Sequence, residues 1–447
     1  MPDRRHGLRL AGAAVLVLTL SGCATSRDFS GLKTPEEWRA AMQAPLSATE
    51  ETMLSDGPSL HDALVLALLR SPGVAAARER WLAAVYREPQ ASSLPDPMLS
   101  GKYLLDSEPQ MARSWTELEA MQPLPWWQKL WAMRRIAATD ADIARLRYEA
   151  AARDLIIDVK DACYELYYLD QALVITERIE TLFRNQALLA YSQLDTGRTV
   201  LAEGFRAENQ AAQLGYDRIL LGEQRAAQAE RLRSLLNLPP GSGIGTIRQA
   251  PVYALSRDLP DLYRRAEAYS EMLRVKGLEI ERAEYEAYLA QLSRLPDFSL
   301  GAMLERAGGG LDDMLLGLVA ANLPIWEQRN RALVRERDVM AEAMRREALD
   351  EANRVRQMAA EAYFSARLSQ RLAQLYAETL LPQAEAVMRQ AEIDFRADLT
   401  SFSSVLETTI AYHNFALSYY RARADYGQAV GRLERVLGTT AGEGPQP

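Results

Sequence analysis

The sequence has few of the residues from which catalytic and metal centres are usually built. Its 447 residues include two cysteines, Cys23 and Cys163, and three histidines, His6, His61 and His413. His61 and His413 stand far apart, and neither has a metal-ligating neighbour three or four positions away, so packed or surface histidines are expected rather than a metal site. Because no other catalytic constellation is visible, we expect no enzymatic activity and no cofactor.

Other absences exclude further classes of protein. No run of 18 apolar residues follows the N-terminal segment, so no transmembrane helix is predicted in the body of the chain. The net charge of −8 argues against nucleic acid as a partner. Cys163 lies beside Ala162 and one helical turn before Leu166, which favours a buried, inert thiol. The 14 methionines are expected to fill gaps in apolar cores rather than to relay copper.

The N-terminus reads as a processing segment. A basic stretch ending at Arg9 precedes the apolar residues 10–20, and the small-residue segment Leu20–Cys23 follows. This pattern resembles a bacterial lipoprotein box, which implies a signal peptide at 1–22 and a lipidated Cys23 that anchors the mature chain. The alanine after the cysteine resembles lipoproteins that are sorted to the outer membrane. The alternative is an ordinary secretory signal with a chance cysteine.

A stretch of about 200 residues occurs twice. At shifts of 200 or 201, three segments are echoed: Ser93–Asp96 by Arg294–Asp297, Leu124–Trp126 by Pro324–Trp326, and 195–199 by 396–400. A repeat of this length is too long for a solenoid unit and predicts two similar halves side by side. The expected parts are a tether at 23–58, a first repeat at 59–237, a linker at 238–260, a second repeat at 261–437 and a disordered tail at 438–447.

Each half follows the same plan of helix, strand, loop, strand, very long helix, turn and long helix. In the first half we expect a helix at 59–86 capped by Ser59 and kinked at Pro72, strands at 98–105 and 113–121, and helices at 126–194 and 199–236. In the second half we expect helices at 261–294, 325–396 with a kink at Pro382, and 401–437, with strands at 298–305 and 313–323 flanking an exposed loop at Gly308–Gly310.

The helix at 126–194 carries a heptad-like stripe, which predicts coiled-coil packing; it consists of Leu155, Val159, Ala162, Leu166, Leu169 and Leu173.

The four extended segments have about the length of transmembrane β-strands. Phe298, Leu300, Ala302 and Leu304 alternate with more polar residues, as in a barrel wall, whereas the other three segments alternate weakly. Four strands cannot enclose a lumen, and lipid does not tolerate open edges, so several chains would have to share one barrel of 8 or 12 strands. The alternative is a soluble four-stranded sheet.

Together these features resemble TolC-type outer-membrane efflux factors. The resemblance covers about 59–438 and rests on the duplication, the lipoprotein box and three motifs, Leu94–Pro97, Gln122–Trp126 and Leu381–Glu385. It implies a mainly α-helical fold with a small β part, in which long helical hairpins form a tunnel. It also implies a homotrimer with one shared outer-membrane β-barrel, and places 238–260 in an equatorial girdle. Its partners would be a periplasmic adaptor and an inner-membrane RND-type pump.

The two hairpin tips depart from the family's aromatic-x-x-Gly pattern, since each keeps one half of it: Leu194 with Gly197, and Phe395 with Asp398. The resemblance assigns adaptor contact to Leu194, Gly197, Arg198, Thr199, Leu399, Thr400 and Ser401. Trp127–Lys129 stands where the heavy-metal branch often has Pro-Gly-Lys, yet the neighbouring motifs still favour that branch.

A pore gate is the one functional constellation that the residues suggest. Asp394 and Asp398 are four positions apart and share a helix face, so threefold symmetry would turn each into a ring of carboxylates. Arg396 would supply an ion-pair partner. The alternative is a solvated helix end with ordinary surface acids.

The sequence thus predicts a passive duct that exports metal ions or small toxic molecules without doing chemistry. The alternative is a periplasmic coiled-coil lipoprotein that acts as a scaffold or adaptor. The exported substrate is not indicated.

Overall fold

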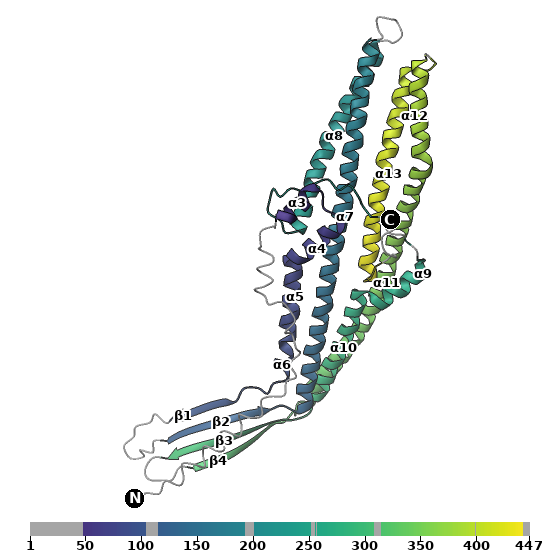
Figure 1. Ribbon diagram of the computed structural model, residues 1–447. Helices are drawn as coiled ribbons and strands as arrows, with labels where there is room; N and C mark the ends of the chain where they lie inside the picture. The colour runs from purple at the N-terminus through teal and green to yellow at the C-terminus, as the bar shows by residue number, and fades with distance from the viewer. Residues whose placement is uncertain are drawn as a thin grey trace. The chain divides into compact units, whose positions relative to one another are not determined.

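A computed structural model describes residues 48–103, 115–192, 201–251, 255, 257–307, 314–397 and 399–440. These residues form long helices and one small sheet (Figure 1). They divide into two compact units. The strand unit comprises the described residues of 83–138 and 285–334, and the helical unit comprises those of 48–82, 139–284 and 335–440.

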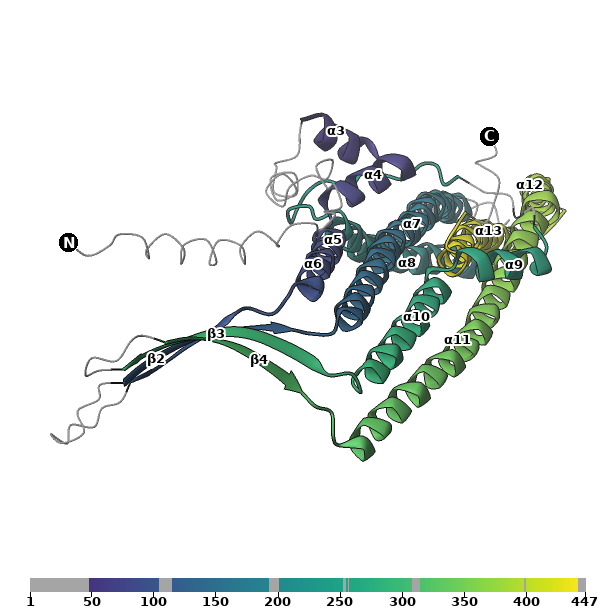
Figure 2. The same cartoon turned by 90° about the horizontal axis from the view of Figure 1, so that it is seen from below.

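The sheet of the strand unit is antiparallel throughout. Its strands are β1 (Met98–Tyr103), β2 (Trp115–Leu124), β3 (Asp297–Ala307) and β4 (Met314–Asn322), and they lie side by side in the order β1-β2-β3-β4 (Figure 1). Figure 2 shows β2, β3 and β4 from below. The two repeats therefore meet at the β2–β3 pair, where Leu124 lies opposite Phe298. Strands β1 and β4 form the two outer edges.

The strand register separates the side chains onto two faces, because residues opposite one another across an antiparallel pair point the same way. One face, here the apolar face, consists of Leu99, Leu118, Phe298, Leu300, Leu304, Leu315 and Val319. These side chains are exposed, from 37% at Leu304 to 77% at Val319. The other, mixed face holds Ser100, Glu117, Glu119, Ser299 and Glu305 alongside Met303. The alternation predicted for β3 is confirmed, but β4 does not share it, because Leu316 and Leu318 on its mixed face are also apolar.

Each repeat begins with a short helix that ends at a serine. Helix α4 (Leu60–Arg70) starts at Ser59, whose side chain accepts a hydrogen bond from the Asp62 N–H, and it is followed by α5 (Pro72–Val85) and α6 (Arg87–Ser92). In the second repeat, Asp258 caps α9 (Leu259–Tyr269), which precedes α10 (Glu271–Leu292). The kink predicted at Pro72 is instead a break at Ser71 between α4 and α5, and the single helix predicted at 261–294 was wrong. Buried Ser270, 1% exposed, interrupts it.

Very long helices make up the rest of each repeat. Helix α7 (Trp127–Ser192) has 66 residues and is about 100 Å long, and α8 (Leu201–Leu235) follows it. The second repeat contains α11 (Glu327–Leu375), α12 (Leu381–Arg396) and α13 (Phe402–Leu437). A single π-helical turn, η2 (Tyr376–Leu380), joins α11 to α12 just before Pro382. Proline cannot donate the backbone hydrogen bond and its ring crowds the preceding turn, so the helix widens there.

Two cores of the helical unit repeat the same packing. The heptad stripe of α7 packs against α4, α8 and the linker through Val159, Ala162, Leu166, Leu60, Ala63, Ala229, Leu232 and Ile247. At shifts of 199 to 201, the equivalent residues of α9, α11 and α13 form the second core: Ala359, Ala362, Ala366, Leu262, Val430 and Leu433. The duplication seen in the sequence is thus a duplication of packing positions.

A third core joins the ends of the long helices. Phe183 of α7, Ala211 of α8 and Phe402 of α13 are buried together. Within the described residues, no single helix is long and apolar enough to cross a membrane, and only the bent pair Leu60–Arg70 and Pro72–Ser92 meets that test by length and composition.

Candidate channel wall and helix-end sites

The cysteine and the two histidines among the described residues are either packed or exposed. Cys163 is 4% exposed, and burial raises the pKa of its thiol to about 12, so the predicted inert thiol is confirmed. The His413 ring lies 3.2 Å from the Thr176 hydroxyl in a buried site, and this burial lowers the pKa of His413. His61 is exposed on α4. In the part of the chain that the structure describes, no three His, Cys, Asp or Glu residues are grouped to hold a metal ion.

The predicted gate lies at the C-terminal end of α12. The half-buried Asp394 carboxylate accepts a hydrogen bond of 2.8 Å from the Gln390 amide, and the Asp394 carbonyl accepts one of 2.8 Å from the Leu399 N–H. Arg396 is exposed, and no ion pair joins it to Asp394. Asp398 lies outside the described residues. The structure thus gives Asp394 a neutral partner, and the ring of carboxylates stays a prediction.

Of the predicted tip residues, the structure describes those of the second tip. Ser401 caps α13 by accepting a hydrogen bond of 3.4 Å from the Ser404 N–H, and the Phe395 and Phe402 rings are 5.3 Å apart. This ring contact closes the turn from α12 to α13. Leu399 is 77% exposed, which leaves an apolar side chain free at the tip. Leu194, Gly197, Arg198 and Thr199 of the first tip lie outside the described residues, as do Cys23 and Gly308–Gly310.

A polar contact, here the junction lock, fastens the two repeats where strands turn into helices. The Lys129 ammonium donates to both carboxylate oxygens of Asp297, at 2.8 and 2.9 Å, and to the Leu295 carbonyl at 2.9 Å. Asp297 also accepts a hydrogen bond of 3.0 Å from the Trp126 N–H. Only 13% of the Lys129 side chain is exposed. The sequence motifs contained both ends of this contact, but their pairing depends on β2 lying beside β3.

The linker at 238–260 is tied to the long helices by buried polar groups. Asp170 of α7 accepts hydrogen bonds from Arg225 of α8 at 2.7 Å and from the Ile247 N–H at 2.8 Å. Arg225 also donates to the Gly245 carbonyl at 3.0 Å. Further along, the Tyr164 hydroxyl donates to the Pro251 carbonyl at 2.7 Å. The irregular segment is therefore fixed by side chains rather than by strand pairing.

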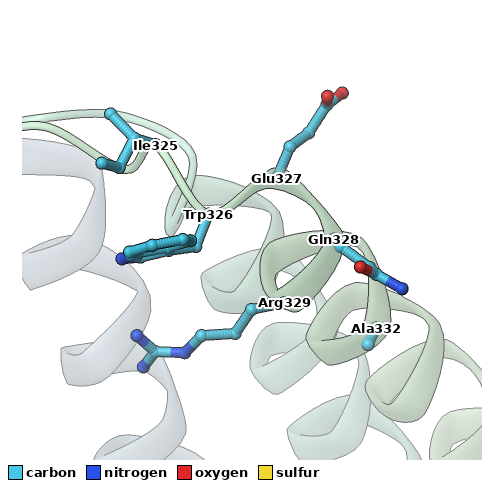
Figure 3. Close-up of a pocket in the computed structure, with 6 residues that line it drawn as sticks. All are labelled: Ile325, Trp326, Glu327, Gln328, Arg329 and Ala332. Carbon is cyan, nitrogen blue, oxygen red and sulfur yellow. The ribbon is translucent and has the colours of Figure 1, made fainter.

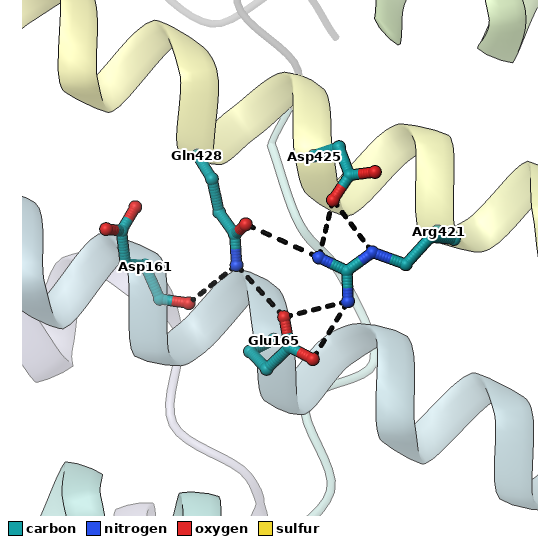
Figure 4. Close-up of polar contacts among 5 residues, drawn as sticks. All are labelled: Asp161, Glu165, Arg421, Asp425 and Gln428. Atoms are coloured by element: carbon teal, nitrogen blue, oxygen red, sulfur yellow. Dashed lines mark hydrogen bonds and ion pairs between the residues drawn. The ribbon is translucent and has the colours of Figure 1, made fainter.

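Charged residues join α7 of the first repeat to α13 of the second (Figure 4). Arg421 donates to both carboxylate oxygens of Glu165 at 2.9 Å and to Asp425, and Gln428 bridges Glu165 and the Asp161 carbonyl. Burial lowers the pKa of Arg421, but the hydrogen bonds that Arg421 donates to Asp425 and Glu165 outweigh this effect, so the net pKa lies above the ordinary value.

Two more ion pairs extend this helix contact. Lys160 pairs with Glu434 at 2.5 Å, and Arg435 pairs with Asp158 at 2.7 Å. The acidic residues of α7 recur every three or four positions beside the heptad stripe. In the sequence, this spacing alone indicates a second, polar contact face on α7.

Comparison with known proteins agrees with this architecture. Residues 262–439 match the family described as outer membrane efflux protein. No curated protein sequence matches the chain significantly.

Solved structures with the same fold cover almost the whole chain. The outer membrane protein VceC from Vibrio cholerae has a TM-score of 0.72 at 18% identity, covering 85% of this chain and 96% of that one. CusC, described for its transmembrane channel formation, has a TM-score of 0.73 at 14% identity, covering 93% and 100%. The MtrE outer membrane channel of Neisseria gonorrhoeae has a TM-score of 0.72 at 13% identity, covering 91% and 96%.

The chain thus has the fold of outer-membrane channels, and its second repeat carries the sequence pattern of outer membrane efflux proteins. The predicted resemblance to TolC-type outer-membrane efflux factors is confirmed. Membership of the heavy-metal branch stays a prediction.

Proposed function

We propose that this chain is the outer-membrane channel of a tripartite efflux pump, a passive duct that does no chemistry. The observation that carries the proposal is the sheet. It has an exposed apolar face, a mixed face with carboxylates and hydroxyls, and an open edge on each side. An apolar outer face and a polar inner face are the arrangement of a transmembrane barrel wall.

The open edges require more than one copy. In hydrocarbon every backbone N–H and C=O must be paired, so a four-stranded sheet is stable there only within a closed barrel. Three copies supply twelve strands, which agrees with the homotrimer that the family resemblance implies. Lipidated Cys23 would anchor each mature chain in the outer membrane.

The helix ends are assigned to the partners. The exposed Leu399, with Thr400 and Ser401 beside it, gives the second tip an apolar contact for a periplasmic adaptor, and 194–199 would form the first tip. An inner-membrane pump would supply the energy. Metal ions or small toxic molecules are the proposed cargo.

Purified full-length protein in a planar lipid bilayer tests the proposal. A channel gives discrete conductance steps and oligomers that resist SDS without heating. The competing function, a periplasmic scaffold lipoprotein with a soluble sheet, predicts neither. Absence of both signals from lipidated, folded protein would overturn the channel assignment.

We further infer that Asp394 and Asp398 narrow the pore, with Arg396 as a nearby cation. Replacing both aspartates with alanine removes the carboxylate ring and is expected to raise single-channel conductance severalfold. Glu385→Ala is the matched control, since Glu385 lies earlier on α12 and pairs with Arg389. If the double variant has the same conductance and the same block by cations as the wild type, Asp394 and Asp398 do not form a gate.

A further inference from the structure

The junction lock has a second, incomplete copy in each chain. Lys129 is the third residue of α7, and Arg329 is the third residue of α11, at a shift of 200. Asp297 ends a Leu-Pro-Asp motif and is the first residue of β3, and Asp96 ends the same motif just before β1, at a shift of 201. The repeat thus supplies a second cation and a second carboxylate in equivalent positions.

Arg329 and Asp96 are far apart within one chain. Arg329 follows β4 and Asp96 precedes β1, and these are the opposite edges of the sheet. Both residues are exposed, and neither has an ion-pair partner among the described residues. The neighbouring tryptophans also differ in exposure. Trp126 is half-buried at the junction lock, whereas Trp326 is 69% exposed.

We propose that Arg329 binds Asp96 of the partner subunit, so that the junction lock is repeated between copies of the chain. This rests on the proposed function, in which β4 of one copy pairs with β1 of the next. The charges are complementary, and each chain offers one unused cation and one unused carboxylate, so any closed ring satisfies all of them.

The strands fix the register of this pairing. Leu124–Pro125 at the end of β2 corresponds to Leu323–Pro324 after β4, a shift of 199, and Phe298 corresponds to Pro97. Because Leu124 lies opposite Phe298, Leu323 should lie opposite Pro97 of the partner subunit, and Ala321 opposite Leu99 of the partner subunit. This register keeps the apolar face continuous across the seam, whereas a slip of one residue would invert it.

The difference between the two shifts explains the choice of cation. One residue more separates strand from helix after β4 than after β2, because the strand shift is 199 and the helix shift is 200. Arginine reaches further than lysine and presents a planar fork that can bind a carboxylate through two hydrogen bonds. Arg329 is therefore suited to span the longer junction.

A surface pocket at this junction marks where the partner's segment would sit. It is lined by Ile325, Trp326, Glu327, Gln328, Arg329 and Ala332 (Figure 3). The Trp326 ring and the Arg329 guanidinium lie on the same side of the helix start, whereas Glu327 points away from them. At the intact lock the Trp126 ring lies 6.5 Å from Phe298. Pro97 of the partner subunit would occupy the equivalent place against Trp326.

Charge reversal in the full-length protein tests the contact. Arg329→Asp or Asp96→Arg alone is expected to lower the fraction of SDS-resistant oligomer roughly tenfold, because like charges then face each other. The double variant restores the pair with its charges exchanged and should recover most of the oligomer. Arg331→Asp is the control, since Arg331 lies on the same helix but pairs with Glu327 of its own chain. Equal oligomer fractions in all variants would overturn the proposal.

A cysteine pair tests the register independently. Leu99→Cys with Ala321→Cys should give intermolecular disulfides on oxidation, whereas Leu99→Cys with Ala320→Cys should not, since that pair points to opposite faces. Cross-linking by the second pair alone would overturn the register. If the oligomers cross-link but do not conduct, the channel function is refuted and the contact between subunits stands. The opposite result is also informative. If the oligomers conduct but neither cross-link at the first pair nor respond to charge reversal, the subunit contact is refuted and the channel function stands.

Discussion

Asp161 is the carboxylate at the contact between α7 and α13 that lacks a cation. Its neighbours Glu165 and Asp158 are paired with Arg421 and Arg435, but its Oδ1 atom is buried and, within the described residues, accepts no hydrogen bond. Burial raises the pKa of Asp161, and the more distant cations offset only part of this effect. An unpaired buried charge costs free energy of folding.

Replacing Asp161 with Asn is expected to stabilise the protein at pH 8 by about 1 kcal/mol, because the buried charge disappears. Since the folded-state pKa is raised, the folded protein binds this proton more tightly than the unfolded chain. The favourable contribution of the protonated carboxyl is present below the unfolded pKa and is lost as the pH rises through the folded pKa. The gain of the variant should therefore shrink as the pH falls through the folded-state pKa, because the wild-type carboxyl then becomes protonated as well.

Thermal unfolding followed by helical circular dichroism measures both effects. Asp158→Asn is the matched control one turn earlier on α7, because it breaks the pair with Arg435 and should lower the unfolding temperature at pH 8. If both variants shift the temperature in the same direction at pH 8, Asp161 is not an unpaired charge in the folded protein.

Among the elements, the linker depends most on a few side chains. Asp170 holds it through Arg225 and the Ile247 N–H, and only 3% of the Asp170 side chain is exposed. Asp170→Ala leaves a cation and an amide without their partner, which typically costs about 3 kcal/mol. We expect the linker to detach locally before the helices unfold.

Limited trypsin digestion reports this detachment, because Arg248 lies exposed in the linker. Cleavage there should become at least roughly tenfold faster in Asp170→Ala, with the helix content unchanged at room temperature. Glu223→Ala, an exposed substitution near Arg225 on α8, should cleave like the wild type. Equal rates for both variants would show that the linker is held by other contacts.

The elements also show what the sequence could predict. The stripe containing Val159 and Leu166 and the position of Pro382 were enough to place long helices, because periodic burial and proline act locally. The break at Ser270 has no proline or glycine to mark it. Yet Ser71 breaks the first repeat 199 residues earlier, just before Pro72, so applying the repeat to the helix boundaries would have revealed it.

Contacts between repeats escaped prediction for a different reason. The pairing of Lys129 with Asp297, and of Glu165 with Arg421, joins residues more than 150 positions apart. Neither spacing nor propensity specifies which charged residues meet, because that follows from strand order and helix packing. The sequence contains the two halves of the junction lock as separate motifs, and only the pairing of β2 with β3 brings them together.

At the scale of the whole molecule, the sheet supports the proposed location in a membrane. The apolar face gives one chain an exposed surface that water does not favour, and among the described residues no strand pairs with the outer edge of β1 or β4. A bilayer satisfies the first requirement, and further copies satisfy the second. Insertion and assembly should therefore fail together when the apolar face is disrupted.

Leu304 and Met303 are adjacent on β3 and point to opposite faces of the sheet, which allows a matched test. Leu304→Lys places a charge on the apolar face and should cost about 2–4 kcal/mol if that face contacts the membrane midplane. Met303→Lys places the same charge on the mixed face opposite Glu119, where water and a carboxylate can accommodate it. In outer-membrane fractions, we expect Leu304→Lys to lose most of the SDS-resistant oligomer and Met303→Lys to retain it. If Met303→Lys loses the oligomer and Leu304→Lys retains it, the mixed face contacts lipid and the apolar face lines the interior of the barrel.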